Sequence, residues 1–396
     1  MYKDKENRLF TSEFIIAIIT SLILFLSVML LTTGLPANIT ATTGKAFMGG
    51  MMTTFFMIAA IITRSMIGYV IQKVNVKILN MAVIILLAVL IFSLSKINSI
   101  PFLLFVRVLQ GICFGILSTS ITTMATNAMP EKRMGEGIGY YGMASSGGIS
   151  FAPMIALAIL QSSSYKVLIF TSTALTMVTF VLMLLSKNKK KEVITATKIT
   201  ATEKISFLEY AFDIRAFLPC ILVLLFSFTL GGVTSFIKPL GKEAGVEATV
   251  SIFFLVEAIV LLISKVLSGI IYDRADHKVI MYPSAVCGII GLYILSTVQS
   301  APMFLLAGVF YGAAFGFLTH TLQSVAVNKV DKKKQGTANA MYLSFMDLGL
   351  ALGSPILGIV ADAKGYRAIY QVSMIFIIIL ILIYAFTIGR EKSYRS

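Results

Sequence analysis

The sequence repeats itself at an offset of 201 residues, and both copies are strongly hydrophobic. The segment Arg64–Lys77 recurs as Lys265–Lys278. The same offset aligns three glycines of the first copy with three of the second, namely Gly111, Gly115 and Gly135 with Gly312, Gly316 and Gly336. An internal repeat of this length predicts two similar halves, each containing the same series of helices.

Lipid is the solvent that this composition requires. Of the 396 residues, 57% are hydrophobic and only 13% are charged. A membrane-crossing helix needs about 20 mostly apolar residues, and twelve stretches qualify. They lie near Phe14–Leu35, Ala46–Ile71, Ile78–Ser95, Pro101–Ala128, Gly137–Leu160, Val167–Ser186, Ile214–Ile237, Glu247–Tyr272, Val279–Val298, Ala301–Asn328, Gly336–Ala361 and Ala368–Ile388. The expected fold class is therefore an all-α integral membrane protein with twelve transmembrane helices in two pseudo-symmetric six-helix bundles.

The net charge of +15 indicates orientation rather than a nucleic-acid partner. Alternate loops, counted from the N-terminus, hold 22 Lys and Arg residues, and the intervening loops hold 7. Loops rich in Lys and Arg stay on the cytoplasmic side. We expect a multi-pass protein of the cell membrane with both termini in the cytoplasm. The basic loops should also attract anionic lipid head groups.

A polar, Lys-rich stretch divides the chain. We expect an N-terminal bundle over residues 1–186, a cytoplasmic linker over 187–213 and a C-terminal bundle over 214–396. The first apolar run is too long for a cleaved signal peptide and is interpreted as a retained span. The short loops leave no room for a soluble catalytic domain, and the sequence has no phosphate-binding loop. Cys113, Cys220 and Cys287 show no metal-type spacing. We therefore expect no enzyme activity, cofactor or metal site.

Three motifs resemble those of the major facilitator superfamily, in particular its twelve-span exporters of drugs and metabolites. The first is the loop pattern G-x-x-x-D-R-x-G-R-R. Gly68 and Lys73 belong to a degenerate first copy, in which Gln72 replaces the acidic residue. The second copy is better preserved and contains Gly269, Asp273 and Arg274. The resemblance implies that these residues form a cytoplasmic gate between helices. The alternative is ordinary turn chemistry in a short loop.

Two further motifs lie within spans. Arg107-Val-Leu-Gln110-Gly111 matches the family pattern R-x-x-Q-G, and the resemblance implies a coupling role for Arg107 and a cavity position for Gln110. Gly148, Ala152 and Pro153 lie in a segment that resembles the exporter motif G-x-x-x-G-P-x-x-G, with two glycines replaced by alanine. The fold, the secondary transport function and monomeric action are expectations that follow from this resemblance.

Ionisable residues near the bilayer centre are candidates for proton coupling because each costs at least about 2.5–3.5 kcal/mol to place there. Arg107, Glu257 and Asp347 are our candidates. An arginine retains its proton, so Arg107 would act on a neighbouring carboxylate or on the substrate. Structural alternatives remain: an ion pair for Arg107, pairing of Glu257 with Lys265, and helix packing for Asp347.

His320 and Gln323 are further candidates for lining the substrate cavity, beside Gln110. A histidine titrates near neutral pH, although a lone histidine in a span is often only a hydrogen-bonded lining residue. The leading hypothesis is proton antiport that exports a small molecule, such as a drug, a toxic compound or a secreted metallophore, by alternating access. The alternatives are a proton-coupled symporter that imports a nutrient and a lipid flippase.

Overall fold

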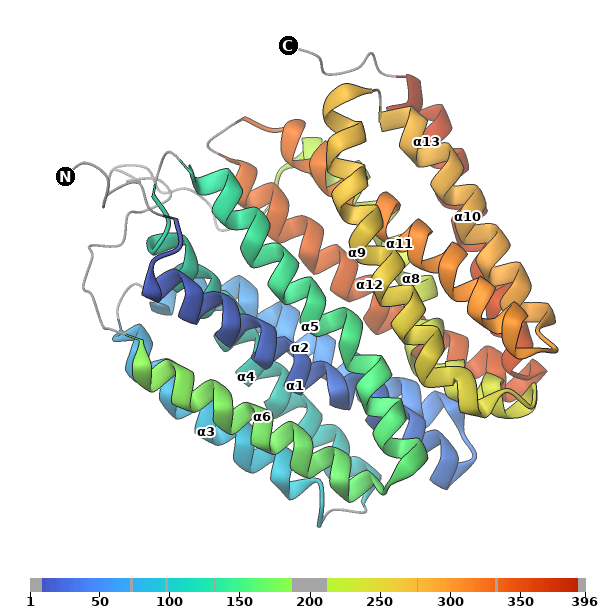
Figure 1. The fold of residues 1–396 in the computed structure, drawn as a ribbon, viewed down its shortest axis with the longest axis horizontal. Coiled ribbons are helices and arrows are strands. Elements are labelled where there is room, and N and C mark those ends of the chain that lie inside the picture. The colour runs from blue at the N-terminus through green and yellow to red at the C-terminus, as the bar shows by residue number, and fades with distance from the viewer. Residues whose placement is uncertain are drawn as a thin grey trace. The chain divides into compact units, whose positions relative to one another are not determined.

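The structure, a computed structural model, describes residues 9–71, 74–96, 99–130, 133–186, 212–275, 277–331 and 334–390. Within these ranges the regular elements are all helical (Figure 1). Twelve of the described helices are long and apolar enough to cross a membrane. The all-α, twelve-helix expectation is therefore confirmed for the described part of the chain.

The twelve long helices fall into two series of six along the sequence. The first series is α1 (Ser12–Thr43), α2 (Ala46–Ile71), α3 (Val76–Ser93), α4 (Ile100–Asn127), α5 (Met134–Ser162) and α6 (Tyr165–Leu185). The second series is α8 (Ile214–Glu243), α9 (Val250–Arg274), α10 (His277–Thr297), α11 (Ala301–Asn328), α12 (Gln335–Lys364) and α13 (Tyr366–Phe386). Two short 3-10 turns, η2 (Glu247–Thr249) and η4 (Ile388–Arg390), accompany the second series.

Two helices continue well beyond their predicted ends. The sequence predicted that the first span ends at Leu35 and the seventh at Ile237, whereas α1 continues to Thr43 and α8 to Glu243. The apolar run stops before Pro36 and Pro239, and such residues usually mark a helix boundary. Here each proline lies inside its helix. Most of the other helix ends lie within about three residues of prediction.

The repeat is preserved in the helix boundaries. Helices α4, α5 and α6 begin at residues 100, 134 and 165, and α11, α12 and α13 begin at residues 301, 335 and 366, 201 residues later in each case. A proline opens both α4 and α11, where its missing N–H would have no helical partner anyway. Gly44 and Gly245, at the same offset, both adopt a positive φ, of 70° and 71°. The two turns that follow α1 and α8 therefore use the same backbone conformation.

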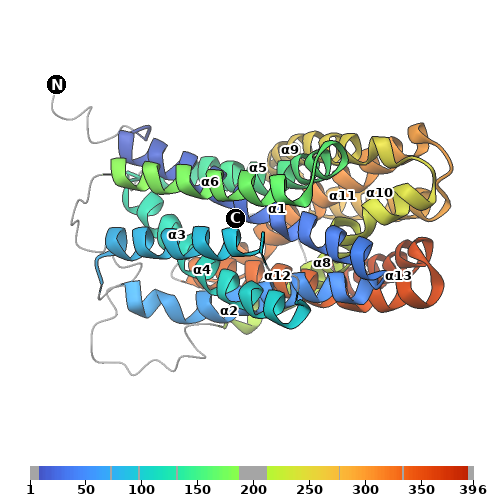
Figure 2. The ribbon, with the colours of Figure 1, turned by 90° about the horizontal axis from the view of Figure 1, so that it is seen from below.

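The described residues form two compact units. One unit comprises residues of Met1–Gly34 and Ile58–Thr195, and the other comprises residues of Leu35–Met57 and Ala196–Ser396. In the first unit α3 runs beside α6 and contacts α4 (Figures 1 and 2). In the second unit α8 packs along α12, α9 along α11, and α10 against both α11 and α13. Each unit has its own buried interior.

Close helix contacts at glycine are the same in both units. A Cβ on Gly115 of α4 would lie 2.8 Å from the Ala60 carbonyl oxygen of α2. A Cβ on Gly316 of α11 would lie 2.6 Å from the Leu261 carbonyl oxygen of α9. All four residues obey the 201-residue offset, and small residues are what allow such close approach in lipid. The sequence repeat is thus also a repeat of tertiary contacts.

Candidate functional site

Arg107 and Gln110 lie together in the interior of the first unit. The Arg107 side chain is fully buried, and its Nη1 donates a hydrogen bond to Gln110 Oε1 over 3.0 Å. Gln110 Nε2 donates to the carbonyl oxygen of Leu90 in α3, over 3.3 Å. Residues three apart on a helix share a face, which explains why the R-x-x-Q spacing forms this pair. Tyr165 of α6 interacts electrostatically with Arg107.

Glu257 lies in α9 of the second unit and is 5% exposed. It interacts electrostatically with Tyr311 of α11. The Tyr311 hydroxyl forms a 2.9 Å hydrogen bond with Thr229 Oγ1 of α8, and its ring stacks on Phe226. A Cβ on Gly312 would lie 2.7 Å from the Glu257 carbonyl oxygen, so the absence of a side chain there lets α11 approach α9. The carboxyl therefore lies in a tightly packed three-helix region.

The predicted cavity residues His320 and Gln323 lie on α11, and the second coupling candidate, Asp347, lies on α12. Asp347 lies in α12 and is partly exposed. Gln323 Nε2 donates to Asn339 Oδ1 over 2.7 Å and so joins α11 to α12. His320 Nε2 lies 3.5 Å from the position that a Cβ on Gly269 of α9 would occupy. The structure thus brings His320 to the first residue of the second gate motif.

The predicted gate residues are only partly described. Gly68 lies within α2 and Gly269 within α9. Asp273 and Arg274 form the last turn of α9, but their side chains are outside the described part of the structure, and Lys73 lies outside the described residues altogether. The gate assignment therefore stays a prediction.

The segment that resembles an exporter motif packs α5 against α1. A Cβ on Gly148 would lie 2.6 Å from the Leu22 carbonyl oxygen. Ala152 is fully buried, and Pro153 lies inside α5. Pro153 removes one backbone donor from the helix. A side chain at position 148 would therefore clash with the backbone of α1.

The end of α1 and the start of α2 contact α12. We name residues Leu35–Met57 the α1–α2 tip, and they belong to the second unit. Asp362 accepts hydrogen bonds from the backbone N–H groups of Ala46, over 2.7 Å, and Phe47, over 3.0 Å. A carboxylate at a helix N-terminus satisfies two unpaired donors and is favoured by the helix dipole.

Sequence reasoning missed one group of residues in the first unit. The Arg64 guanidinium of α2 lies 5.1 Å above the ring of Phe114, and its Nε donates to Ser118 Oγ over 3.2 Å. Arg64 also interacts electrostatically with Tyr141 of α5, whose hydroxyl forms a 2.9 Å hydrogen bond with Thr122. Arg64 begins the first copy of the repeat, so its alignment with Lys265 was the signal that could have revealed it.

Charged residues form a network where α8 begins. Asp213 receives hydrogen bonds from Arg215 Nε over 3.1 Å and Nη2 over 3.0 Å. Arg215 also pairs with Asp331, and Lys334 Nζ lies 3.6 Å from Asp213. The hydrogen bond from Arg215 is the main reason that the pKa of Asp213 falls to about 2. The same arginine lowers the pKa of Asp331.

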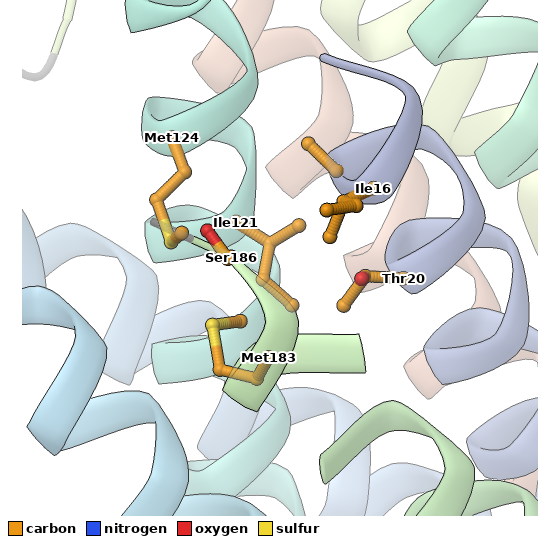
Figure 3. Close-up of a pocket in the computed structure, with 7 residues that line it drawn as sticks. Ile16, Thr20, Ile121, Met124, Met183 and Ser186 are labelled. Carbon is orange, nitrogen blue, oxygen red and sulfur yellow. The ribbon is translucent and has the colours of Figure 1, made fainter. Parts of the chain in front are cut away.

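A narrow pocket lies elsewhere in the first unit, between α1, α4 and α6. Figure 3 shows the side chains of Ile16, Thr20, Ile121, Met124 and Met183 around it. None of the predicted site residues lines this pocket, and its walls are almost wholly apolar. It offers no arrangement of groups for binding a polar substrate.

The described residues contain no group of three or more His, Cys, Asp and Glu side chains that could hold a metal ion. All three cysteines lie in described helices and are free thiols.

Comparisons with known proteins address the family. A sequence model described as Major Facilitator Superfamily matches residues 17–353 and 284–396 of this chain. The Staphylopine export protein of Staphylococcus aureus is 23% identical over 352 residues, covering 84% of this chain and 85% of the relative. The Multidrug resistance protein MdtG of Enterobacter lignolyticus is 22% identical over 296 residues, covering 72% of this chain and 69% of the relative.

Solved structures show the same fold. A mutant of the nucleoside transporter NupG has a TM-score of 0.79 at 15% identity, covering 96% of this chain and 100% of that one. A bacterial homolog of the human lysosomal transporter Spinster has a TM-score of 0.76 at 14% identity, covering 97% of this chain and 98% of that one. At these identities the likeness shows the fold alone, and it confirms the fold class that the sequence predicted.

Proposed function

Because the chain belongs to the major facilitator superfamily, we propose that it exports a small molecule across the cell membrane in exchange for protons, by alternating access. Two relatives that match most of the chain are named for staphylopine export and for multidrug resistance. The segment with Gly148, Ala152 and Pro153, which resembles an exporter motif, supports the same direction of transport. Candidate substrates are therefore a drug, a toxic compound or a secreted metabolite.

The burial of the Glu257 carboxyl is the main observation in support of proton coupling. It is 5% exposed within a helix long and apolar enough to span a membrane. Placing an ionisable carboxyl there costs free energy, and ionisable residues within membrane spans usually have a function. Glu257 is the proposed proton carrier, Asp347 is the second candidate, and Arg107 is proposed to couple proton movement to substrate binding. His320, Gln110 and Gln323 are proposed to line the substrate cavity.

The proposed topology follows from the charge distribution. Loops rich in Lys and Arg would lie in the cytoplasm with both termini. The gate residues Gly68, Lys73, Gly269, Asp273 and Arg274 would then act at the cytoplasmic side. The two bundles, 1–186 and 214–396, joined by the linker 187–213, would move relative to one another. A single copy of the chain would be sufficient for transport. One proton entering across about 150 mV supplies roughly 3.5 kcal/mol for the cycle.

The test is substrate-dependent proton flux in everted membrane vesicles, followed with a pH-sensitive dye. The added compounds are ethidium, norfloxacin, chloramphenicol, citrate and a zinc–nitrilotriacetate complex. We expect at least one compound to collapse the pH gradient with the wild-type protein. Glu257→Gln, which is similar in size but cannot release a proton, should abolish the response, and Arg107→Ala should reduce it at least tenfold.

Lys166→Gln is the control, because Lys166 lies exposed at the start of α6. It should behave like the wild type. A wild-type protein that is well expressed but gives no proton flux with any compound would argue against antiport. Uptake of one of these compounds into intact cells, driven by an inward proton gradient, would then favour a nutrient symporter. Movement of fluorescent lipid without proton flux would favour a flippase.

A further inference from the structure

Three residues with hydroxyl groups lie on one face of α13. Tyr366, Tyr370 and Ser373 are spaced four and three residues apart, and residues at this spacing share a face of a helix. Tyr366 is partly exposed, whereas Tyr370 and Ser373 are fully buried. We name these three residues the hydroxyl row. It begins at the end of α13 that the proposed topology places outside the cell.

Two contacts fix the register of α13 against α8 in the second unit. The ring centroids of Phe236 and Tyr366 lie 6.4 Å apart, and those of Phe228 and Phe376 lie 4.0 Å apart. The residue number rises along α13 as it falls along α8, so the two helices are antiparallel. Thr229 of α8 therefore lies at the level of the inner end of the hydroxyl row.

Thr229 and Tyr311 connect this level to Glu257. The Tyr311 hydroxyl is hydrogen-bonded to Thr229 over 2.9 Å, and Tyr311 interacts electrostatically with both Tyr370 and Glu257. A Cβ on Gly312, the next residue of α11, would lie 3.0 Å from the Glu257 Cα. Tyr311 is thus the residue that interacts with the hydroxyl row on one side and with the carboxyl on the other.

The buried hydroxyl groups of the row are not used for packing contacts between helices. Within the part of the chain that the structure describes, the hydroxyls of Tyr370 and Ser373 have no hydrogen-bond partner. Buried hydroxyls are normally hydrogen-bonded to protein or to ordered water, and an unsatisfied one costs about 1–3 kcal/mol. These two hydroxyls are therefore able to bind water molecules within the helix bundle.

The outer end of the hydroxyl row lies beside two carboxylates. Tyr366 interacts electrostatically with Asp362 of α12 and Glu243 of α8, and both carboxylates are exposed. Glu243 also pairs with Arg367, whose Nε lies 3.5 Å from Glu243 Oε1. Carboxylates around an entrance raise the local concentration of cations, protons included.

Helix α9 itself provides no polar route from its outer end to Glu257. The carboxyl lies about 10 Å along the helix from Val250, at 1.5 Å per residue. All residues between Ser251 and Glu257 are apolar, and Phe253 and Phe254 among them are fully buried. An isolated charge is too costly to place among apolar side chains, so a proton needs polar groups from other helices to reach Glu257.

We propose that the hydroxyl row and Tyr311 form the path by which protons from outside the cell reach Glu257, with Thr229 positioning the Tyr311 hydroxyl. Each hydroxyl receives a proton on its oxygen and passes its own hydrogen to the next group, so it ends unchanged. Bridging water molecules complete the chain. The net result is transfer of one proton from the outer solution to the Glu257 carboxylate. This inference rests on the proposed antiport and names the residues that deliver its proton.

The test is the rate at which Glu257 becomes protonated after a rapid drop in pH. The purified full-length protein is attached to a gold surface through a tag at its N-terminus and embedded in lipid, which leaves the proposed outer face toward the solution. A laser flash releases protons from a caged acid, and surface-enhanced infrared spectroscopy follows the carbonyl band of the protonated carboxyl. The band that is missing in Glu257→Gln identifies this residue.

We expect Tyr370→Phe and Tyr311→Phe, which remove one hydroxyl each and keep the ring, to slow the rise of the Glu257 band by about tenfold. In Tyr370→Phe the final intensity of the band at each pH should equal that of the wild type, because this variant changes the path and not the carboxyl. A purely structural role would not change the rate alone. Tyr384→Phe is the matched control. Tyr384 is also fully buried in α13, but its hydroxyl bonds His277 and lies outside the path.

The path is rejected if both Phe variants protonate Glu257 at the wild-type rate, or if Tyr384→Phe slows protonation equally. A wild-type protein without a Glu257 band at any pH would reject both the proposed proton carrier and the path. Substrate-driven proton flux in vesicles that Tyr370→Phe and Tyr311→Phe leave unchanged would keep antiport and reject the path. Slower protonation in these variants, without substrate-driven flux in the wild type, would keep the path and reject antiport.

Discussion

At the scale of single residues, the Asp213 carboxylate makes three contacts at the start of α8. It caps α8 by accepting a hydrogen bond from the Arg215 backbone N–H over 3.0 Å. The same side chain binds the Arg215 guanidinium and lies near Lys334. The carboxylate is 5% exposed, and its pKa is lowered to about 2, mainly by the Arg215 hydrogen bond. The start of the second series of helices is therefore fixed by a charged group.

This geometry predicts a pH-dependent contribution to stability. Since the folded pKa lies below the unfolded value of about 3.9, the contribution is complete above pH 4 and is lost as the pH falls toward 2. Asp213→Asn keeps the cap but loses the charge, so its melting temperature should be lower than wild type at pH 7 and approach it near pH 3. Asp213→Ala also loses the cap and should cost about 1 kcal/mol more.

Asp331→Asn is the matched comparison because Asp331 binds the same arginine but is 72% exposed. Exposed ion pairs contribute little to stability. The melting temperature of Asp331→Asn at pH 7 should therefore differ from that of the wild type much less than the melting temperature of Asp213→Asn does. If the melting temperature of Asp213→Asn is lower than that of the wild type by the same amount at pH 3 and pH 7, the charge of Asp213 does not provide the proposed stabilisation.

At the scale of helices, close packing at small residues decides how α8 and α12 pair. A Cβ on Gly353 would lie 2.1 Å from the Phe228 carbonyl oxygen. The equivalent residue of the first half is Ala152, which is fully buried in α5 and fits there. The same motif position thus accepts a methyl group in one half and excludes it in the other.

Gly353→Ala should therefore destabilise the protein although alanine is the better helix former. We expect a loss of about 1–3 kcal/mol from overpacking, measured as a lower melting temperature in detergent. Gly142→Ala is the control, because nothing lies within 4 Å of its Cβ position. Alanine there should be neutral or stabilise α5 by up to about 1 kcal/mol. Equal melting temperatures for the two variants would show that the α8–α12 contact tolerates a shift.

At the scale of the whole molecule, α1 and α2 belong to both units. Each helix is divided between them, because Leu35–Met57 groups with the second unit. The α1–α2 tip is fixed there by Asp362, and Thr54 Oγ1 donates to the Ala351 carbonyl oxygen of α12 over 2.7 Å. These contacts join two segments of the chain about 300 residues apart.

Loss of the Asp362 carboxylate should loosen the tip. In Asp362→Ala the amide hydrogens of Ala46 and Phe47 lose their acceptor, so hydrogen exchange over residues 46–57 should accelerate severalfold. Exchange in α3, which belongs to the other unit, should not change. Asp362→Asn keeps one side-chain acceptor and should give an intermediate rate. Unchanged exchange in Asp362→Ala would mean that the tip is held by packing at Gly50 and Gly358 alone.

The sequence by itself determined the number, order and boundaries of most helices, and the equivalence of the two halves. Hydropathy acts locally, so the apolar runs that begin at Pro101 and Ala301 located the starts of α4 and α11 to within one residue. The R-x-x-Q spacing also placed Arg107 and Gln110 on one helix face. These features depend on neighbours along the chain, and the chain displays them directly.

Only the tertiary structure decided which distant side chains meet. It placed Arg64 over Phe114, Glu257 near Tyr311, and Asp362 at the start of α2. It also extended α1 and α8 through Pro36 and Pro239, past the end of their apolar runs. The physical reason is that helix pairing depends on backbone approach at a few small residues, and that approach depends on both partners at once. Periodicity in one segment carries no information about the face that another segment presents.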